Sequence, residues 1–438
     1  MTRSLLVPIS NLYGNGDFTA QILLEGVASP LNLILDTGSS TLVVDAAHIE
    51  HLQPIPTTIA QRVAYGMGSW IGPVVKHAVI LGHENDNVRL PEVHLAIEQS
   101  LDKNTFMLAD GILGLAYSEL NLAHDIQHYL NQLNIQPAST YPWPAAVFEK
   151  NISDLDDILF TSPKHHITPY FDELEKHNLV ANQFAFVVHR SSIYRGDPEQ
   201  DDNALAHHPL NTGILVVGNP KLHSHMHKND FQTVKVVHDK YYNVNVLSIG
   251  LSGQTQIPFP KLEAKHVKSY ISNGIVDSGA SAMVFPQSVF NQLLAQFSTH
   301  NTDFKHLLST YETFTGKEIG IPLDLVNLDS WPDLIIVLEN ELGNTAELKL
   351  SASTYWQTHA PKKNQISFKI TSLPDWPNQA ILGLPLLNNY FTIFNRSAGE
   401  TGTIEFANKH FCPHLMTDKQ HQDKQTLKQH FMQHKHIL

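Results

Sequence analysis

The sequence of 438 residues has a single cysteine, Cys412, and no long apolar run. One cysteine cannot form an intramolecular disulfide, and secreted enzymes of this size more often carry one or more. No stretch approaches the roughly 18 apolar residues that a membrane span requires. The apolar run near the N-terminus is shorter than the roughly 7 to 15 residues of a signal-peptide core. These absences predict a cytoplasmic protein with no membrane partner.

Charged residues are also scarce, at 16% of the chain, and the folded part has no basic cluster interleaved with aromatic residues. Such a cluster is typical of nucleic-acid binding, so we expect no nucleic-acid partner. Histidine is abundant, with 27 residues against a formal net charge of −13 that counts them as neutral. The surface charge should therefore depend strongly on pH.

The first informative motif is "LNLILDTGSSTLVV" at residues 31–44, in which Asp36 interrupts a run of apolar residues. Such a run predicts a buried strand, and a carboxylate at its end costs free energy unless other groups satisfy it. The residues that follow, Thr37, Gly38 and Ser39, are small or carry a hydroxyl, so their amides and hydroxyls can approach the carboxylate closely. We infer that Asp36 is held in place for a purpose, although an isolated motif of this kind would more often cap a turn.

A second copy of this pattern, "SNGIVDSGASAMVFP", occupies residues 272–286 and places Asp277 after another apolar strand. Each copy is followed by an apolar element with glycine, "ADGILGLAY" at 109–117 and "QAILGLPLL" at 379–387. Two features that recur in the same order predict duplicated lobes, as the length of the chain also favours.

The remaining sequence favours a mainly β protein. Alternating segments such as "DFTAQILLE" (17–25), "QFAFVVHR" (183–190) and "TGILVVGN" (212–219) are separated by glycine, proline and asparagine. Helical periodicity is brief and occurs at 118–133 and 287–297.

Together these motifs resemble those of pepsin-like aspartic proteases over roughly residues 15–410. "DTGSS" and "DSGAS" are similar to the two catalytic loops of that family, and "VAYGMGSWIG" at 63–72 is similar to its flap hairpin. The apolar elements with glycine and the passage "ITPYFDELEKHNLVANQFAFVV" at 167–188 follow in the family's order. One such motif alone would be weak evidence, but the order of all of them is specific.

The resemblance implies a bilobal, mainly β fold with a cleft between an N-terminal lobe (1–190) and a C-terminal lobe (191–412). A polar tail rich in His, Lys and Gln (413–438) would follow. It further implies an aspartic endopeptidase, active as a monomer on peptides or proteins, with no cofactor and no metal.

The same resemblance assigns catalysis to Asp36 and Asp277, with Gly38 and Gly279 supporting them. Two carboxylates at one site cannot both ionise easily, so the pair holds one proton and one charge. Such a pair can activate water as general base and polarise a scissile carbonyl as general acid.

Hydroxyl groups beside the aspartates are similar to the family's supporting residues. Thr37 and Ser278 match a grip in which each side chain binds the backbone of the opposite loop, and Ser39 matches a donor to the first aspartate. Ala280 stands where many members carry threonine, so Asp277 should lack such a donor. Because a hydrogen bond to a carboxylate lowers its pKa, we expect activity to extend to higher pH than with both hydroxyls present.

Tyr65 and Gly66 match the family's flap, which closes over substrate and excludes water. Val43 stands where members often have a tryptophan that partners the flap tyrosine, so the flap should be positioned differently here. An insertion around residues 121–166 is long enough that it should either have a function or lack order.

The start of the chain also departs from secreted relatives. Strand-like residues begin at about Leu5, which leaves no room for a signal or a basic prosegment. We therefore expect synthesis without a prosegment, as in bacterial pepsin homologues such as the shewasins.

Two other functions and a metal site are compatible with parts of the sequence. A catalytically silent pepsin-fold protein that binds peptides or proteins stays open because of Val43 and Ala280. A glycosidase with paired carboxylates is disfavoured by the hydroxyl and glycine context of both aspartates. Histidine pairs such as His223 with His225, or His430 with His434, have metal-ligand spacing, but no carboxylate or cysteine spacing completes a set.

Overall fold

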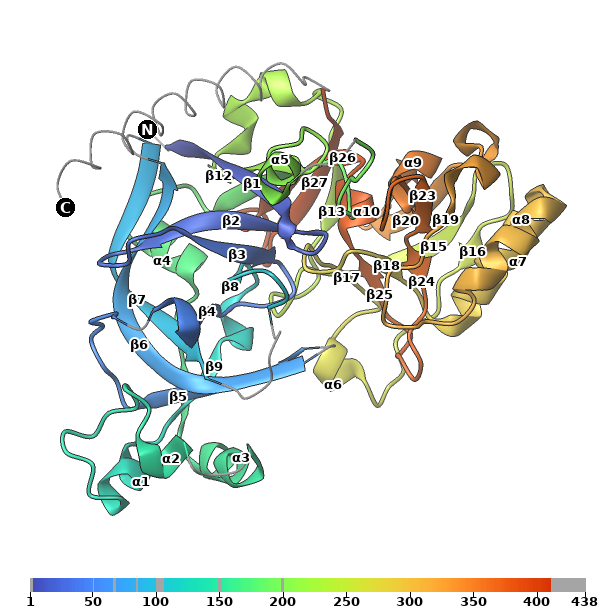
Figure 1. Cartoon of the computed structure of the whole chain (residues 1–438). Coiled ribbons are helices and arrows are strands. Elements are labelled where there is room, and N and C mark those ends of the chain that lie inside the picture. Colours follow the sequence, from blue (N-terminus) through green and yellow to red (C-terminus); the bar gives the residue numbers. More distant parts are fainter. Residues whose placement is uncertain are drawn as a thin grey trace.

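The computed structural model describes residues 3–49, 51–65, 68–83, 86–99, 106–148, 152–197 and 201–410. Its strands form two lobes on either side of a shared sheet (Figure 1), with the N-terminal lobe in blue to cyan and the C-terminal lobe in yellow to orange. The prediction of a mainly β, bilobal fold is confirmed. Among the described residues, no helix has the length and apolar character that crossing a bilayer requires.

The largest sheet has 15 strands and runs from the N-terminal lobe through the shared centre of the molecule. In spatial order its strands are β10 (Lys164–His166), β9 (Leu122–Asp125), β5 (Ile59–Tyr65), β6 (Gly68–His83), β7 (Asp86–Glu98), β4 (Leu42–Asp45), β8 (Gly111–Gly114), β3 (Leu31–Asp36), β2 (Asp17–Leu24), β1 (Ser4–Gly14), β12 (Thr212–Gly218), β11 (Gln183–Val187), β26 (Tyr390–Asn395), β27 (Thr403–Asn408) and β13 (Gln232–Lys235).

The C-terminal lobe contributes three smaller sheets. They are, in spatial order, β14 (Asn243–Val244), β17 (Gly274–Val276), β25 (Ala380–Leu382), β18 (Met283–Val284) and β24 (Ile370–Thr371); then β16 (Ile257–Pro258), β15 (Val246–Leu251), β20 (Leu334–Glu339) and β21 (Thr345–Leu350); and β19 (Ile321–Pro322), β23 (Gln365–Phe368) and β22 (Trp356–Thr358). In β21 every second residue is buried, which is the pattern of a strand with one face on the core.

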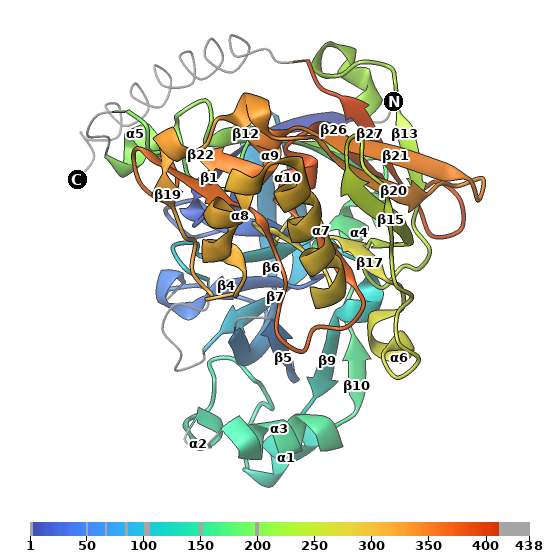
Figure 2. The ribbon, with the colours of Figure 1, turned by 90° about the vertical axis from the view of Figure 1, so that its right-hand side faces the viewer.

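Most helices lie at the periphery of both lobes (Figures 1 and 2), whereas the short helix Leu384–Leu387 is buried. The α-helices are α1 (Gln127–Gln132), α2 (Ala145–Phe148), α3 (Ile152–Thr161), α4 (Tyr170–Lys176), α5 (Asp202–Ala206), α6 (Val267–Tyr270), α7 (Gln287–His300), α8 (Thr302–Leu308), α9 (Ala352–Tyr355) and α10 (Leu384–Leu387). Short 3-10 turns are η1 (Ala46–His48), η2 (Ser118–Leu120), η3 (Pro220–Leu222), η4 (Ser224–Met226), η5 (Ser309–Tyr311), η6 (Leu323–Leu325) and η7 (Leu328–Ser330).

The helix predicted at 287–297 is confirmed as α7, whose buried residues, including Phe290, Leu293 and Phe297, recur at helical spacing. The helix predicted at 118–133 is wrong in its first half. There the chain forms η2 and then β9, and α1 begins only at Gln127. The open edge of β5 explains the difference, because β9 pairs with it and the backbone gains sheet hydrogen bonds there.

The central strands join the two lobes through one continuous core. Phe184 of β11 stacks on Phe394 of β26 with ring centroids 4.9 Å apart, and Tyr242 packs edge-on against Phe394 at 4.6 Å. All three side chains are fully buried. Because these aromatic side chains pack densely, the shared sheet is rigid and fixes the position of the two lobes relative to each other.

Candidate active site

Asp36 stands at the end of β3, a strand whose other residues are almost all buried. β3 pairs in parallel with β8, with Asp36 opposite Gly114, and β8 pairs antiparallel with β4. The loop from β3 to β4 therefore passes over the end of β8. This crossing places the Asp36 carboxyl at the floor of the lobe, 9% exposed.

Asp277 occupies the corresponding place in the C-terminal lobe. It directly follows β17, which pairs in parallel with β25, and β25 pairs antiparallel with β18. The arrangement of β17, β25 and β18 repeats that of β3, β8 and β4. The duplication that the sequence predicts is thus visible in the pairing of the strands that carry both aspartates.

Glycines in the apolar elements allow these crossings. A Cβ atom on Gly114 would lie 2.5 Å from the backbone of Ser40 and Thr41. A Cβ atom on Gly383 would lie 2.3 Å from the carbonyl oxygens of Ala280 and Ala282. Because real side chains do not approach backbone so closely, only glycine fits where each loop crosses its strand.

The two loops grip one another through Thr37 and Ser278. The Thr37 amide donates to the Ser278 hydroxyl at 3.0 Å, and the Ser278 amide donates to the Thr37 hydroxyl at 2.9 Å. Each hydroxyl in turn donates to a strand of the other lobe, Thr37 to the Val276 carbonyl at 3.0 Å and Ser278 to the Leu35 carbonyl at 2.7 Å. All four bonds are buried, so they fix the two loops in one relative position.

Glycine also lets each loop approach the opposite carboxyl. A Cβ atom on Gly38 would lie 2.8 Å from both carboxylate oxygens of Asp277, and one on Gly279 would lie 2.6 Å from Oδ1 of Asp36. The Gly38 amide donates to Asp36 Oδ1 at 2.7 Å and the Gly279 amide to Asp277 Oδ1 at 2.9 Å. The structure therefore places Asp36, Asp277, Gly38 and Gly279 next to one another.

The two carboxyls differ in acidity. Burial raises the pKa of Asp36, while the Ser39 hydroxyl, the Gly38 amide and a hydrogen bond shared with Asp277 lower it. Burial and then the negative charge of Asp36 raise the pKa of Asp277 well above its usual range, and only the Gly279 amide counteracts this among its larger influences. These influences favour the protonated form of Asp277 more than that of Asp36, and the two carboxyls titrate as one coupled pair.

Ser39 and Ala280 contribute to this difference. Ser39 is buried beside Asp36 and lowers the pKa of that carboxyl. Its hydroxyl makes no hydrogen bond of ordinary geometry among the described residues, so it acts through proximity rather than a well-aligned bond. Ala280 has no hydroxyl to offer Asp277.

A third carboxyl, which the motifs do not indicate, lies near the pair. Asp17, at the start of β2, is 8% exposed, and its Oδ1 atom has no hydrogen-bond partner in the described part of the chain. Burial raises the pKa of Asp17 well above its usual range, the charge of Lys369 lowers it, and the charge of Asp36 raises it. The charge of Asp17 also raises the pKa of Asp277. A carboxylate opening a buried strand was the only sequence signal for it.

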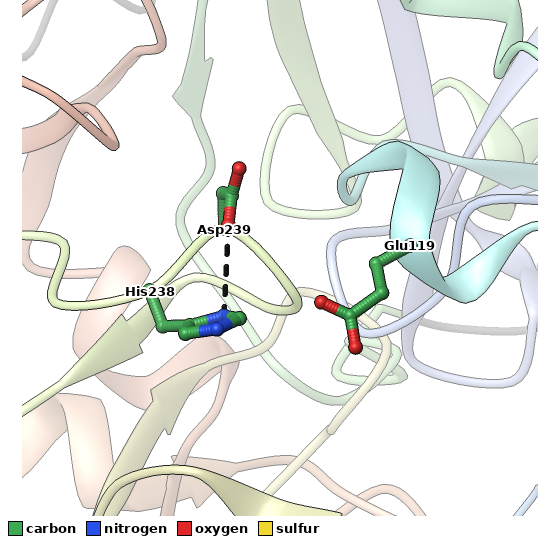
Figure 3. Close-up of side chains that lie close together, drawn as sticks. All are labelled: Glu119, His238 and Asp239. Atoms are coloured by element: carbon green, nitrogen blue, oxygen red, sulfur yellow. Dashed lines mark ion pairs between the residues drawn. The ribbon is translucent and has the colours of Figure 1, made fainter.

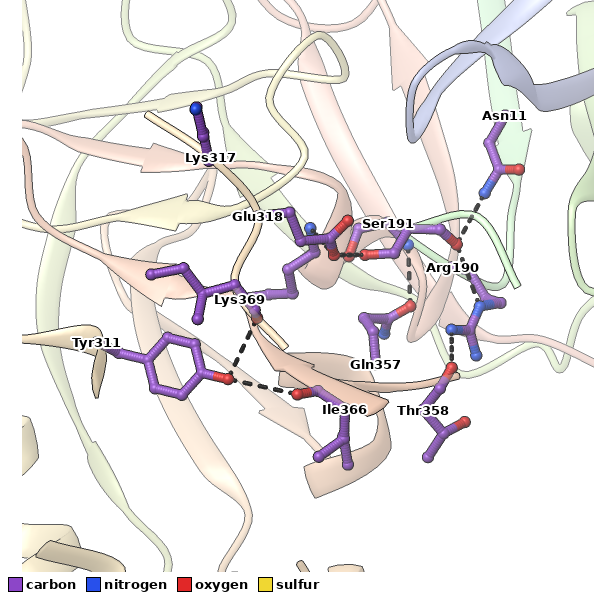
Figure 4. Close-up of polar contacts among 12 residues, drawn as sticks. Asn11, Arg190, Ser191, Tyr311, Lys317, Glu318, Gln357, Thr358, Ile366 and Lys369 are labelled. Atoms are coloured by element: carbon purple, nitrogen blue, oxygen red, sulfur yellow. Dashed lines mark hydrogen bonds and ion pairs between the residues drawn. The ribbon is translucent and has the colours of Figure 1, made fainter. Parts of the chain in front are cut away.

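A buried polar network supports the joint between the lobes (Figure 4). Lys369 forms an ion pair with Glu318 at 2.9 Å, and Glu318 accepts a hydrogen bond from the Ser192 hydroxyl. The Ser192 carbonyl accepts from Arg190 at 3.2 Å and from Asn11 at 3.1 Å. These contacts fasten the segment at the expected lobe boundary to both lobes.

The segment that resembles the flap is the hairpin of β5 and β6. Tyr65 ends β5 and pairs with Gly68, whereas the Tyr65 side chain and all of Gly66 lie outside the described residues. Trp70, on β6, is buried in a small apolar cluster that also contains Val43 and Phe106. An indole from the hairpin itself thus occupies the apolar cluster in which Val43 lies, which the sequence comparison did not anticipate.

The insertion at 121–166 is folded in its described residues. β9 and β10 extend the sheet beyond β5, and α1 to α3 lie on the outer side of the hairpin (Figure 1). Its apolar side chains form a cluster with Ala60 and Ile71 of the hairpin. Arg62 of β5 forms an ion pair with Asp156 of α3 at 2.8 Å. The insertion therefore braces the base of the hairpin.

Of the two histidine pairs with metal-ligand spacing, only His223 and His225 lie among the described residues. His223 bonds to the Ser4 hydroxyl at 2.8 Å, and its ring meets that of His225 edge-on with centroids 6.0 Å apart. His430 and His434, with the rest of the tail at 413–438 and Cys412, lie outside the described residues.

Comparison with known proteins agrees with the geometry. The model of the eukaryotic aspartyl protease family matches residues 203–409, which include Asp277 and most of the expected C-terminal lobe. No curated protein matches the chain. Both the repeated strand arrangement and this match, which covers a little under half of the chain, are consistent with a pepsin-like aspartic protease fold.

Proposed function

We propose that this protein is an aspartic endopeptidase in which Asp36 and Asp277 jointly activate a water molecule for attack on a peptide bond. The observation that carries the proposal is the reciprocal grip of Thr37 and Ser278, which holds two buried carboxyls from different lobes against each other's glycines. Similarity of the C-terminal half to eukaryotic aspartyl proteases supports hydrolysis of peptides or proteins.

The different acidities of the two carboxyls assign their roles in this proposal. Asp36, ionised, takes a proton from water as the water oxygen forms a bond to the scissile carbonyl carbon. Asp277, protonated, donates to the carbonyl oxygen as that oxygen gains negative charge. The tetrahedral intermediate then collapses: the C–N bond breaks as Asp36 gives its proton to the leaving amine, and one hydroxyl proton of the intermediate returns to Asp277, which restores the starting state of the pair. No covalent bond to the enzyme and no cofactor is required.

Other residues take supporting roles. The Gly38 and Gly279 amides each donate to the carboxyl of their own loop and hold it in place, and Ser39 lowers the pKa of Asp36, which favours its ionised form. Tyr65, which ends β5, and Gly66, which follows it in the sequence, would close over an extended peptide and exclude water. We propose that the enzyme acts as a monomer, because both aspartates come from one chain.

The test is digestion of a complex peptide mixture by the full-length protein between pH 3 and 7, with cut sites identified by mass spectrometry. Asp36→Asn and Asp277→Asn should each lower the cleavage rate by a factor of about a thousand, because each removes a proton-transfer group. Asp303→Asn, on exposed α8, is the control and should cleave like the parent. No cleavage by well-folded parent protein at any pH would contradict the proposal and favour a protein that only binds peptides.

A further inference from the structure

Three side chains outside the carboxyl pair meet at a junction between the lobes. Glu119 lies in η2, shortly after β8, whereas His238 and Asp239 lie in the connection from β13 to β14. Figure 3 shows the three side chains facing one common space. Each offers one ligand atom, and these atoms all lie within 4.8 Å of one another. In the part of the chain that the structure describes, no other group of three or more such side chains has this geometry.

The donor atoms suit a divalent transition-metal ion. His238 Nδ1 makes no hydrogen bond among the described residues and lies 3.6 Å from Asp239 Oδ1, with which it forms an ion pair when the imidazole is protonated; the His238 side chain is 37% exposed and that of Asp239 58%. A neutral imidazole nitrogen in this position can bind a metal ion without first losing a hydrogen bond. One imidazole and two carboxylates are a donor set that zinc accepts, with water in the fourth position of a tetrahedron.

The two segments that carry these residues also support the two loops of the carboxyl pair. On the Glu119 side, the Leu115 amide donates to the Asp36 carbonyl at 2.7 Å. On the His238 side, the Tyr242 carbonyl accepts from the Val276 amide at 3.1 Å, next to Asp277. The segments touch where the Tyr242 hydroxyl donates to the Leu115 carbonyl at 2.9 Å. A metal ion held by both segments would add a further link beside that bond.

We propose that Glu119, His238 and Asp239 form a binding site for one zinc-like divalent cation that ties together the segments behind the two aspartate loops. The site is separate from the carboxyl pair, and the proposal does not depend on protease activity. It would act as a structural link between the lobes.

Lys240 limits the affinity of this site. Its Nζ atom lies 4.0 Å from Glu119 Oε1. Its positive charge therefore partly neutralises the carboxylate and repels a cation bound there. Replacement of Lys240 by glutamine should therefore tighten zinc binding severalfold.

Calorimetric titration of the full-length, chelator-treated protein with zinc tests the proposal. Because the chain has many histidines, the informative quantity is the binding that disappears in variants. Glu119→Gln and His238→Gln should each weaken one equivalent of zinc by at least about tenfold, as expected when a ligand is removed from a small site. His306→Gln, an exposed histidine on α8, is the matched control and should bind zinc like the parent.

Thermal unfolding gives an independent measurement. Zinc at about 100 times its dissociation constant should raise the Tm of the parent by about 3 °C, and this shift should be lost in Glu119→Gln and His238→Gln. Parent-like zinc binding and an unchanged Tm shift in both variants would overturn the proposal. Magnesium, which prefers octahedral oxygen ligands, should produce no shift.

Discussion

The two aspartate loops share a backbone design and differ in the residue that follows the glycine. In both, a buried strand ends at an aspartate, a hydroxyl residue grips the other lobe, and a glycine amide donates to the carboxyl. They differ one residue further on, where Ser39 accompanies Asp36 and Ala280 accompanies Asp277. A symmetric backbone can therefore hold two carboxyls with different pKa values. The shared hydrogen bonds fix the position of the loops, whereas the residue after each glycine affects the pKa of the neighbouring carboxyl.

The largest expected loss of activity comes from substituting the two glycines that both loops share, Gly38 and Gly279. Gly38→Ala would place a methyl group 2.8 Å from the oxygens of Asp277, and Gly279→Ala would place one 2.6 Å from Asp36. Each should push the carboxyls apart, and we expect at least a hundredfold loss of peptide cleavage, because misplacement by about 1 Å has effects of this size.

Gly343→Ala provides the control for this prediction. A Cβ atom there meets nothing within 4 Å, although the positive φ of 75° adds some backbone strain. It should retain the parental rate with at most a small loss of stability. Parental cleavage rates in Gly38→Ala and Gly279→Ala would show that the close approach is not needed.

A smaller effect, on the stability of the fold, is expected when a hydroxyl is removed from the hydrogen bonds between Thr37 and Ser278. Thr37→Val removes a hydroxyl that bonds both the Ser278 amide and the Val276 carbonyl, and leaves those buried groups unpaired. Unfolding in urea should show a loss of about 2 kcal/mol or more, since each unpaired buried group costs roughly 1–3 kcal/mol.

The other loop supplies the matched comparison. Ser278→Ala should cost about as much as Thr37→Val, because it also removes two buried bonds. Thr37→Ser keeps the hydroxyl and should stay within about 0.5 kcal/mol of the parent, as the second loop already uses serine. An equal loss in Thr37→Ser and Thr37→Val would assign the effect to packing instead.

The smallest expected effect is a shift of the pH–rate profile when the residue that differs between the loops, Ser39 or Ala280, is changed. Under the proposed function cleavage requires Asp36 ionised and Asp277 protonated, so the rate should rise with pH through the lower apparent pKa of the pair and fall through the higher one. Ala280→Thr adds a donor that lowers the pKa of Asp277, and it should move the basic limb of the pH–rate profile down by about one unit. Ser39→Ala removes a group that lowers the pKa of Asp36, and it should move the acidic limb upward.

Ala280→Val separates shape from hydrogen bonding, because valine has the shape of threonine without its hydroxyl. It should leave the basic limb where the parent has it. If Ala280→Thr also leaves that limb unmoved, Ala280 does not set the upper pH limit of activity.

Much of the scaffold could be predicted because it is recorded in local sequence. Asp36 and Asp277 each interrupt an apolar strand, and the glycines at 114 and 383 recur at matching places because backbone must pass them closely. The helix α7 was predictable for a similar reason, since its apolar residues recur at helical spacing.

What could not be predicted depends on contacts between distant segments. Residues 122–125 have a pattern compatible with a helix, and they form a strand only because the edge of β5 lies beside them. Trp70 gives no sign in the sequence that it occupies the cluster around Val43. Glu119 and His238 lie on different lobes, so only the folded chain shows that they meet.

The grip between Thr37 and Ser278 also bears on the birth of the protein. These residues are 241 positions apart, so the first lobe leaves the ribosome long before its partner loop has been made. Until then Asp36 has no second acid, and under the proposed function a nascent or half-folded chain cannot cut its neighbours. Assembly of the two lobes would thus be the activating step, because the carboxyl pair that cleaves peptides forms only when both lobes have folded against each other.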